Sequence, residues 1–152
     1  MQYTPKERDP LFDSARNITE NLGMALVDFA VFRQKGRAQV QAVVYKPGYV
    51  SLEDCSRVHH ALIPRLEEAF PGQALHVEVS SPGINRTLKD AAEFRHYIGR
   101  GIRCFRTDIS DWAGGVLESA DETGLVLTGK NGAIPLGYDI IAKAKLDYSQ
   151  EA

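Results

Sequence analysis

The stretch "ALHVEVSSPGINRTLKD", residues 74–90, decides how the chain is divided. Its first residues alternate between apolar and polar, which is typical of a strand covered on one face and places Leu75, Val77 and Val79 in a core. Four small residues follow at once: Ser80, Ser81, Pro82 and Gly83. A basic segment with Arg86 and Lys89 comes next. A phosphate-binding turn, a catalytic serine and a plain connector are all compatible with this stretch alone.

Upstream, the sequence predicts a helix followed by a hairpin. Asp9 and Pro10 suit a helix start, because aspartate can accept hydrogen bonds at the cap and proline is tolerated at the first helical position. An apolar stripe then runs to Gly23 through Leu11, Ala15, Ile18 and Leu22. Residues 25–33 and 37–46 read as two strands joined by a turn. Residues 25–33 are apolar on both faces, so we expect this strand to lie centrally or to be covered on both sides.

A second helix is predicted after Pro47-Gly48. Ser51 with Asp54 three residues later resembles a capping box. The stripe continues through Leu52, Cys55, Val58 and Leu62. Pro64 is expected to break or kink this helix. With the strand at residues 74–80, the first half reads α-β-β-α-β.

Downstream, the pattern changes to short strands. "LKDAAEFRHYIG", residues 88–99, predicts a short helix stopped by Gly99. Short apolar runs follow at residues 100–107, 114–120, 124–129, 132–138 and 144–148, separated by turns that include "SDWAG", and residues 138–145 allow one helical turn. This spacing predicts a small β-barrel or sandwich. The predicted fold class is therefore α+β, with an N-terminal α/β domain at residues 1–98 and a C-terminal barrel domain at residues 99–152.

Composition indicates an ordinary globular chain. It has 152 residues, 43% hydrophobic and 25% charged. No apolar run approaches the roughly 18 residues of a membrane span, and residues 1–10 lack the apolar segment of a secretory signal. Cys55 and Cys104 lie far apart, which favours a reduced, cytoplasmic protein over a disulfide scaffold.

Charge is distributed unevenly. The net charge of −2 argues against a uniformly basic nucleic-acid binder. Residues 83–106 nevertheless carry six basic groups against the two acids Asp90 and Glu93, a formal charge of +4, whereas the remaining 12 basic and 18 acidic groups give −6. The six are Arg86, Lys89, Arg95, Arg100, Arg103 and Arg106. Such a window can direct one surface towards phosphate, and the alternative is a solvated face.

No motif predicts catalysis, a metal or a cofactor. Ser80 and Ser81 lack a G-x-S-x-G elbow. Cys55 and His59 lie four apart on the predicted helix, with His60 beside them, but no further ligand accompanies them, and Cys55 falls on the apolar stripe. The glycine pairs match no P-loop or dinucleotide fingerprint. Trp112 suits either a stacking platform for a base or the closure of one end of a barrel.

Taken together, the residues 77–105 resemble the signature of the bacterial RimP family of ribosome maturation factors, whose core pattern is E-V-S-S-P-G-L-D-R-P-L. "ENLGMALVDFAVF", "KPGYVSLEDCSRV" and the blocks at residues 115–127 and 134–146 resemble further family segments in the right order. The resemblance runs from about Leu11 to Tyr148. This chain departs from the pattern at Asn85, where aspartate is usual, and at Thr87, where proline is common.

The resemblance implies a non-enzymatic protein with a C-terminal barrel of the Sm or SH3 type, without cofactors. It implies binding to the immature small (30S) ribosomal subunit, to small-subunit ribosomal protein number twelve and to 16S rRNA phosphates, as a cytoplasmic monomer. The motif-matched binding residues are Ser80, Ser81, Pro82, Gly83 and Arg86. Charge alone adds Lys89, Arg95, Arg100 and Arg103. The alternative hypothesis is a stand-alone Sm-type protein that binds free RNA.

Overall fold

The computed structural model describes residues 1–5 and 9–151. Its contacts divide them into two compact units. Residues 9–82 form the first, called here the α/β unit. Residues 1–5 and 83–151 form the second, called here the β unit. Each unit is described by itself.

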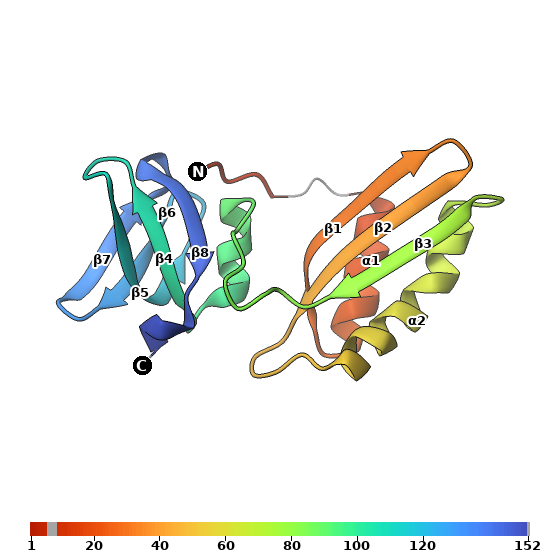
Figure 1. Cartoon of the computed structure of the whole chain (residues 1–152), viewed down its shortest axis with the longest axis horizontal. Coiled ribbons are helices and arrows are strands. Elements are labelled where there is room, and N and C mark those ends of the chain that lie inside the picture. Colours follow the sequence, from red (N-terminus) through yellow and green to blue (C-terminus); the bar gives the residue numbers. More distant parts are fainter. Residues whose placement is uncertain (6–8, 152) are drawn as a thin grey trace. The chain divides into compact units, whose positions relative to one another are not determined.

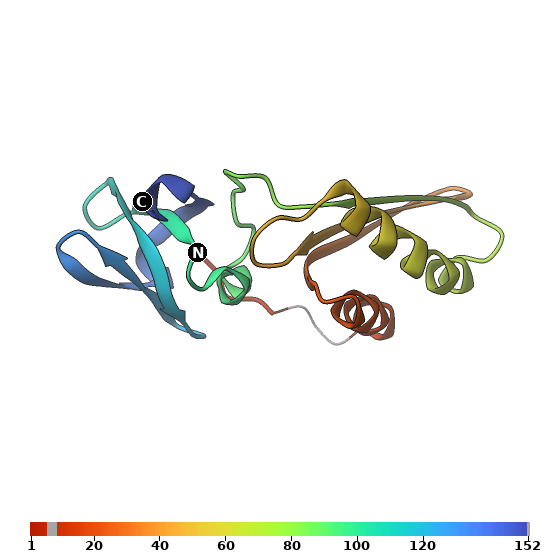
Figure 2. The same ribbon diagram turned by 90° about the horizontal axis from the view of Figure 1, so that it is seen from below.

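The α/β unit has the predicted order α-β-β-α-β. Its elements are α1 (Pro10–Asn21), β1 (Ala25–Gln34), β2 (Arg37–Tyr45), α2 (Leu52–Ala69) and β3 (Ala74–Ser80). The strands form a mixed sheet in the order β1-β2-β3, with β1 and β2 antiparallel and β2 and β3 parallel. Both helices cover the same face of this sheet (Figures 1 and 2). The core between them contains Ala15, Met24, Leu26, Phe29, Ala38, Val40, Ala42, Val44, Val58, Leu62, Leu66 and Phe70.

The helix starts follow the sequence signals. The Asp9 side chain accepts a hydrogen bond from the Leu11 N–H at 2.8 Å, and Gly23 after the helix has a φ of 82°. The expected break at Pro64 is wrong, since α2 runs unbroken through this residue, whereas a kink there stays a prediction. Val58, Leu62 and Leu66 are all buried on the two sides of Pro64. This continuous apolar face stabilises the helix against the loss of one main-chain hydrogen bond.

The expected central position of residues 25–33 is also wrong. β2 is the middle strand and β1 lies at the edge. Phe29 faces the helices and is buried, whereas Phe32 pairs with Gln39 on the opposite face and is 54% exposed. Apolar side chains on both faces of a strand therefore did not require a second covering layer within this unit.

The β unit contains a five-stranded antiparallel sheet in the order β7-β6-β5-β4-β8. The strands are β4 (Gly101–Arg106), β5 (Asp111–Ala120), β6 (Gly124–Gly129), β7 (Gly132–Gly137) and β8 (Ile141–Leu146). The strands form a strongly curled sheet (Figure 2). The buried side chains of these strands include Ile102, Leu117 and Leu127. Within the described residues, no pairing joins β7 to β8, so closure into a barrel stays a prediction.

Three short 3-10 helices complete the β unit: η1 (Ala91–Tyr97), η2 (Tyr138–Ile140) and η3 (Tyr148–Glu151). η1 is the short helix predicted before Gly99, and η2 is the predicted helical turn. The expected turn "SDWAG" is wrong, because Trp112 lies inside β5 and the turn is at residues 107–110. Ser110 there has a φ of 51°.

The first residues of the chain pack in the β unit. The Gln2 carbonyl accepts a hydrogen bond from the Ala91 N–H at 2.9 Å. Tyr3 stacks on Tyr138, and Tyr138 stacks on Phe94. The two contact units therefore meet at Pro82 and Gly83, earlier than the boundary at residue 99. The predicted boundary at residue 99 separates domains that would fold independently, and it stays a prediction.

Candidate functional site

The serine segment is exposed. Ser80 is the last residue of β3 and pairs with Val43 of β2. Ser80 and Ser81 are both exposed, and Pro82 is half-buried. Within the described part of the chain, neither serine hydroxyl takes part in a hydrogen bond that would couple it to a base. The two hydroxyls are thus available to an external acceptor, whereas the geometry offers no activated nucleophile.

A tight turn follows the serines. The Arg86 N–H donates to the Gly83 carbonyl at 3.2 Å, which places Ile84 and Asn85 at the tip. Both tip residues are exposed, and Ile84 is 73% exposed. A Cβ at Gly83 would meet only the Asn85 Oδ1, at 3.7 Å. Gly83 therefore leaves an open approach to the main chain of this turn.

After the turn, the chain lies against the edge of β8. The Leu88 N–H donates to the Ala144 carbonyl at 3.0 Å, and the Leu146 N–H donates to the Arg86 carbonyl at 2.9 Å. Neither bond uses the N–H of Thr87. Proline, which is common at this position in the resembling pattern, would therefore preserve both bonds. Residues 86–88 cover the edge of the sheet, which would otherwise be open to pairing.

The side chain of Arg86 forms an ion pair with Glu93 inside the β unit. Its Nε lies 2.8 Å from the Oε1 of Glu93, and the two side chains are only 12% and 7% exposed. The other Glu93 oxygen accepts the Lys89 N–H at 2.8 Å. A guanidinium held in this way contributes to the fold of the β unit, and little of its charge reaches the surface.

The remaining basic residues of the window differ in their surroundings. Arg100 lies 3.0 Å from Glu151, and Arg106 lies 2.7 Å from Asp108. Together with Arg86, at least three of the six cations of the window therefore form ion pairs with described residues. Lys89 and Arg95 are exposed. Arg95 Nε lies 3.5 Å from the Nε2 of His96, the upper limit for a hydrogen bond.

Arg103 is held by an aromatic ring. Its guanidinium carbon lies 5.0 Å from the centroid of the Trp112 ring, within the range of a cation–π interaction. Trp112 also contacts Phe105 edge-on, with the ring centroids 5.5 Å apart. Lys143 and Lys145 of β8 pair with Phe105 and Arg103 in the strand register, and the sequence analysis missed both. The alternation in "IAKAKL" was the signal that could have found them.

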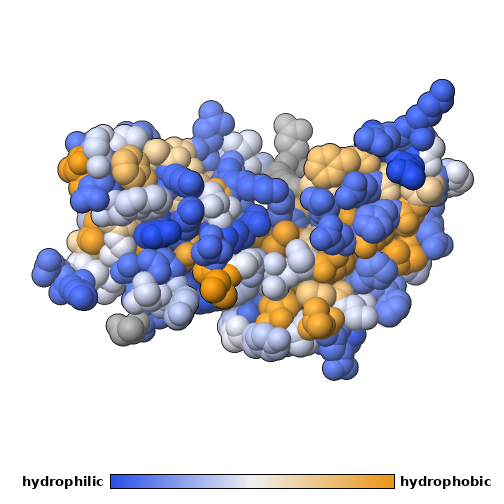
Figure 3. Space-filling model, in the orientation of Figure 1, coloured by the Kyte–Doolittle hydropathy of each residue, from blue (hydrophilic) through white to orange (hydrophobic). Residues whose placement is uncertain are grey.

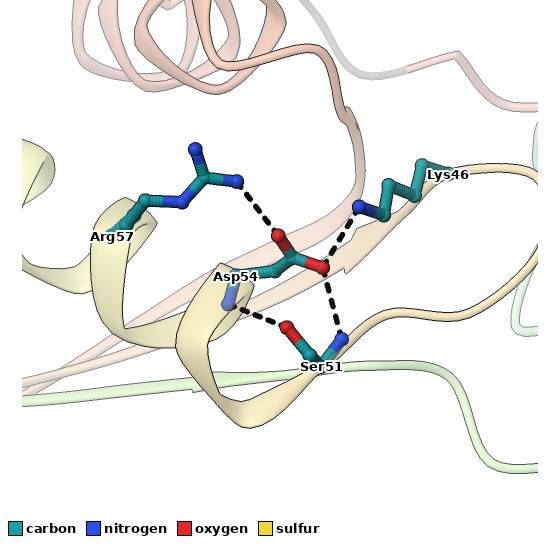
Figure 4. A network of polar contacts seen from close by, with 4 residues as sticks. All are labelled: Lys46, Ser51, Asp54 and Arg57. Atoms are coloured by element: carbon teal, nitrogen blue, oxygen red, sulfur yellow. Dashed lines mark hydrogen bonds and ion pairs between the residues drawn. The ribbon is translucent and has the colours of Figure 1, made fainter.

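A second polar network surrounds the start of α2 (Figure 4). The predicted capping box is confirmed, since the Ser51 Oγ accepts the Asp54 N–H and the Asp54 Oδ2 accepts the Ser51 N–H, both at 3.0 Å. Lys46 and Arg57 also bind this carboxylate, at 2.9 and 2.7 Å. The Ser51 N–H first, and then both cations, hold the pKa of Asp54 well below its usual value. The charged groups of this network therefore stabilise the start of α2.

The described residues contain no cluster that could hold a metal ion. Cys55 and His59 are half-buried and His60 is exposed on α2. The pKa of the Cys55 thiol is raised by burial and then by the charge of Asp54, which disfavours a thiolate ligand. Among those same residues, no helix is long and apolar enough to cross a membrane.

Comparison with known proteins found a matching family model and relatives that align over most of the chain. The family model of the RimP N-terminal domain matches residues 14–85. The ribosome maturation factor RimP of Borrelia hermsii (strain HS1 / DAH) is 26% identical over 140 residues, covering 92% of this chain and 96% of that protein. The factor of the same name from Borrelia recurrentis (strain A1) is 25% identical over the same shares.

These matches point to one class, since both relatives are named ribosome maturation factors and the family model is that of the RimP N-terminal domain. Over most of its length the chain is therefore similar to members of the RimP family.

Proposed function

We propose that this protein binds the immature small (30S) ribosomal subunit and promotes its assembly, as a cytoplasmic monomer and without chemical transformation of its partner. The observation that carries this proposal is the alignment over nearly the whole length of proteins named ribosome maturation factor RimP. An alignment of that extent includes both units.

The exposed residues of the serine segment and the turn are the proposed contact. Ser80, Ser81 and the main-chain groups near Gly83 can donate hydrogen bonds to 16S rRNA phosphates, with Pro82 fixing the backbone between them. Lys89 and Arg95 are exposed basic residues of the same segment. Arg86 and Arg100 are ion-paired, so we expect them to stabilise the local structure and to contribute little net positive charge to the surface.

The β unit is proposed to be an Sm- or SH3-like barrel that associates with small-subunit ribosomal protein number twelve. Its strand order supports this, because the last strand, β8, pairs with the first strand, β4, as closure of a five-stranded barrel requires. Part of the edge of β8 is occupied by residues 86–88.

Co-sedimentation with purified immature and mature small subunits tests the proposal. We expect the wild-type protein to sediment with immature particles, and its binding to fall steeply with salt if phosphates dominate the contact. Equal binding to immature and mature particles, or none to either, would contradict it. Sedimentation of the free protein as a ring-sized oligomer would favour the alternative, a protein of the Sm type acting on free RNA.

Two variants locate the contact. Gly83→Ala should leave the fold intact, because the added Cβ meets only one atom at ordinary distance. It should weaken binding if the particle approaches this main chain closely. Lys89→Glu with Arg95→Glu should also weaken binding, whereas Lys35→Glu with Lys130→Glu makes the same charge change at two exposed turn positions elsewhere. Full binding by both test variants would refute the proposed contact.

A further inference from the structure

A cluster of cations and aromatic rings lies on the outer face of β4, β5 and β8. Inward-facing residues of these strands, such as Ile102, Cys104 and Ala144, are buried. The residues between them face outward. The strand register pairs Phe105 with both Trp112 and Lys143, and Arg103 with Lys145. These five residues are called here the β4–β5–β8 face: Arg103, Phe105, Trp112, Lys143 and Lys145.

The β4–β5–β8 face is compact. Three neighbouring strands span roughly 10 Å, and alternate residues on one strand lie roughly 7 Å apart. All five side chains therefore fall within an area comparable to about two nucleotides. The surface over β4 and β8 is coloured mainly as hydrophilic (Figure 3).

The three cations are not neutralised by ion pairs. Within the described residues, Arg103, Lys143 and Lys145 form no salt bridge. The charge of Arg103 does act on the carboxylate of Asp147, whose pKa is lowered by hydrogen bonds from Gln150 and Ser149 and, less strongly, by Arg103. The carboxylate oxygens of Asp147 are thus engaged by its own turn, at 2.6 and 3.0 Å.

The aromatic part of the face is partly open. Trp112 is 39% exposed although Arg103 lies over its ring and Phe105 contacts it. Burial of this ring would be more favourable than exposure if its role were only to stabilise the unit. The Arg103 guanidinium orients the ring, and its own Nε is buried without a hydrogen-bond partner among the described residues.

We infer that the β4–β5–β8 face binds single-stranded nucleic acid, with a base stacked against Trp112 or Arg103 and the neighbouring phosphates on Lys143 and Lys145. An exposed ring beside unpaired cations is the combination that single-strand binding requires, because stacking is possible with every base and the cations follow the backbone. An acidic peptide would use the cations but would gain little from an exposed tryptophan. The inference goes beyond the proposed function, since it concerns a different surface and predicts binding of single-stranded nucleic acid that is not part of a ribosomal particle.

The chain itself provides the assay. Trp112 is the only tryptophan of the sequence, so tryptophan fluorescence, excited selectively over that of the six tyrosines, reports on this face. Titration of the full-length protein with a short oligoadenylate RNA is expected to quench this fluorescence saturably. The corresponding DNA oligomer shows whether the sugar matters. Inorganic polyphosphate and an oligoglutamate peptide test charge without bases.

Variants separate stacking from charge. Trp112→Ala should weaken binding of a labelled RNA about fivefold or more, and Trp112→Phe should retain much of it, because a smaller ring still stacks. Lys143→Gln with Lys145→Gln should reduce the slope of log affinity against log salt by about 1.4, at about 0.7 per lost phosphate contact. Lys35→Gln with Lys130→Gln, outside the face, should change neither quenching nor slope.

Three results would overturn the inference. The first is that neither RNA nor DNA quenches the fluorescence saturably, and the second is that polyphosphate or oligoglutamate binds as tightly as RNA. The third is an unchanged RNA affinity in the Lys143→Gln/Lys145→Gln variant. This third test is valid even if the Trp112→Ala variant does not fold. If that double variant instead lost only its association with a small-subunit ribosomal protein, the face would be a protein interface. Co-sedimentation with immature subunits is measured separately, so either idea can fail alone.

Discussion

The ion pair between Arg86 and Glu93 is the most direct point at which the family motif can be tested for a structural role. Both side chains are nearly buried, and Arg86 Nε lies 2.8 Å from the carboxylate. Replacing Arg86 by methionine leaves the Glu93 carboxylate without its cation, and replacing Glu93 by methionine leaves the guanidinium without its anion. The double variant removes both charges and keeps side chains of similar length.

The expected magnitude follows from burial. Loss of one partner from a buried ion pair costs about 3–5 kcal/mol, whereas replacing both partners by apolar residues is often neutral or stabilising. With a urea dependence of about 1.5 kcal/mol per molar, each single variant should lower the unfolding midpoint by roughly 2–3 M. A unit of this size has a total stability of about 5 kcal/mol or somewhat more, so a single variant is expected to be close to unfolded without denaturant.

Urea unfolding followed by tryptophan fluorescence is a suitable assay, because Trp112 lies in the β unit and is the only tryptophan. The double variant should be more stable than either single variant, although it also loses the acceptor for the Lys89 N–H. If Arg86→Met is as stable as the wild type, or if the double variant loses the sum of the two single losses, the ion pair does not hold the β unit as argued.

Three further predictions concern caps, pH and thiols. Ser51→Ala should destabilise the α/β unit by about 1 kcal/mol, because the N-cap acceptor is lost; circular dichroism during thermal unfolding measures this, with the exposed Ser56→Ala on the same helix as control. The pKa of His96 is lowered to about 4 by burial and then by Arg95. The unfolded chain therefore binds a proton near pH 6.5 that the folded chain does not, so stability should fall from pH 6.5 to 4 and fall less in His96→Gln. Burial raises the pKa of the Cys104 thiol to about 12, so a thiol reagent at pH 8 should label Cys55 in the folded protein and Cys104 only after unfolding. Equal labelling rates before unfolding would contradict this burial.

The α/β unit could be predicted closely from local signals. The Asp9-Pro10 start and the Ser51 capping box are short-range patterns, and both are present. The effect of Pro64 could not be read in the same way, because it depends on tertiary packing of the helix face that contains Val58 and Leu62. The edge position of β1 could not be predicted from local sequence either, since strand order is set by long-range pairing.

In the β unit, strand existence was predictable and strand limits were not. The turn was expected at "SDWAG" because of its small and polar residues, yet Trp112 lies within β5 and pairs with Phe105 of β4. The packing of residues 1–5 beside η1 depends on contacts between the two ends of the sequence. No local pattern at the N-terminus indicates them.

The charge window shows why linear counting is insufficient for a candidate site. Residues 83–106 hold a formal charge of +4, but Glu151 and Asp108 pair with two of its cations, and the first lies far outside the window while the second lies just beyond it. Conversely, Lys143 and Lys145 lie outside the window and reach Arg103 and Phe105 through the strand register. The charge that a partner meets is set by cross-strand neighbours, which a sequence window does not contain.

The residues from Ser80 to Leu88 are subject to two different requirements. Ser80, Ser81 and Gly83 are exposed and make few contacts, so their conservation in a pattern would need an external partner. Arg86 and Leu88 instead hold the edge of β8 and the buried ion pair. Loss of particle binding in an Arg86 variant therefore says little about contact unless the β unit is shown to be folded, whereas the same loss in Gly83→Ala points directly to the partner.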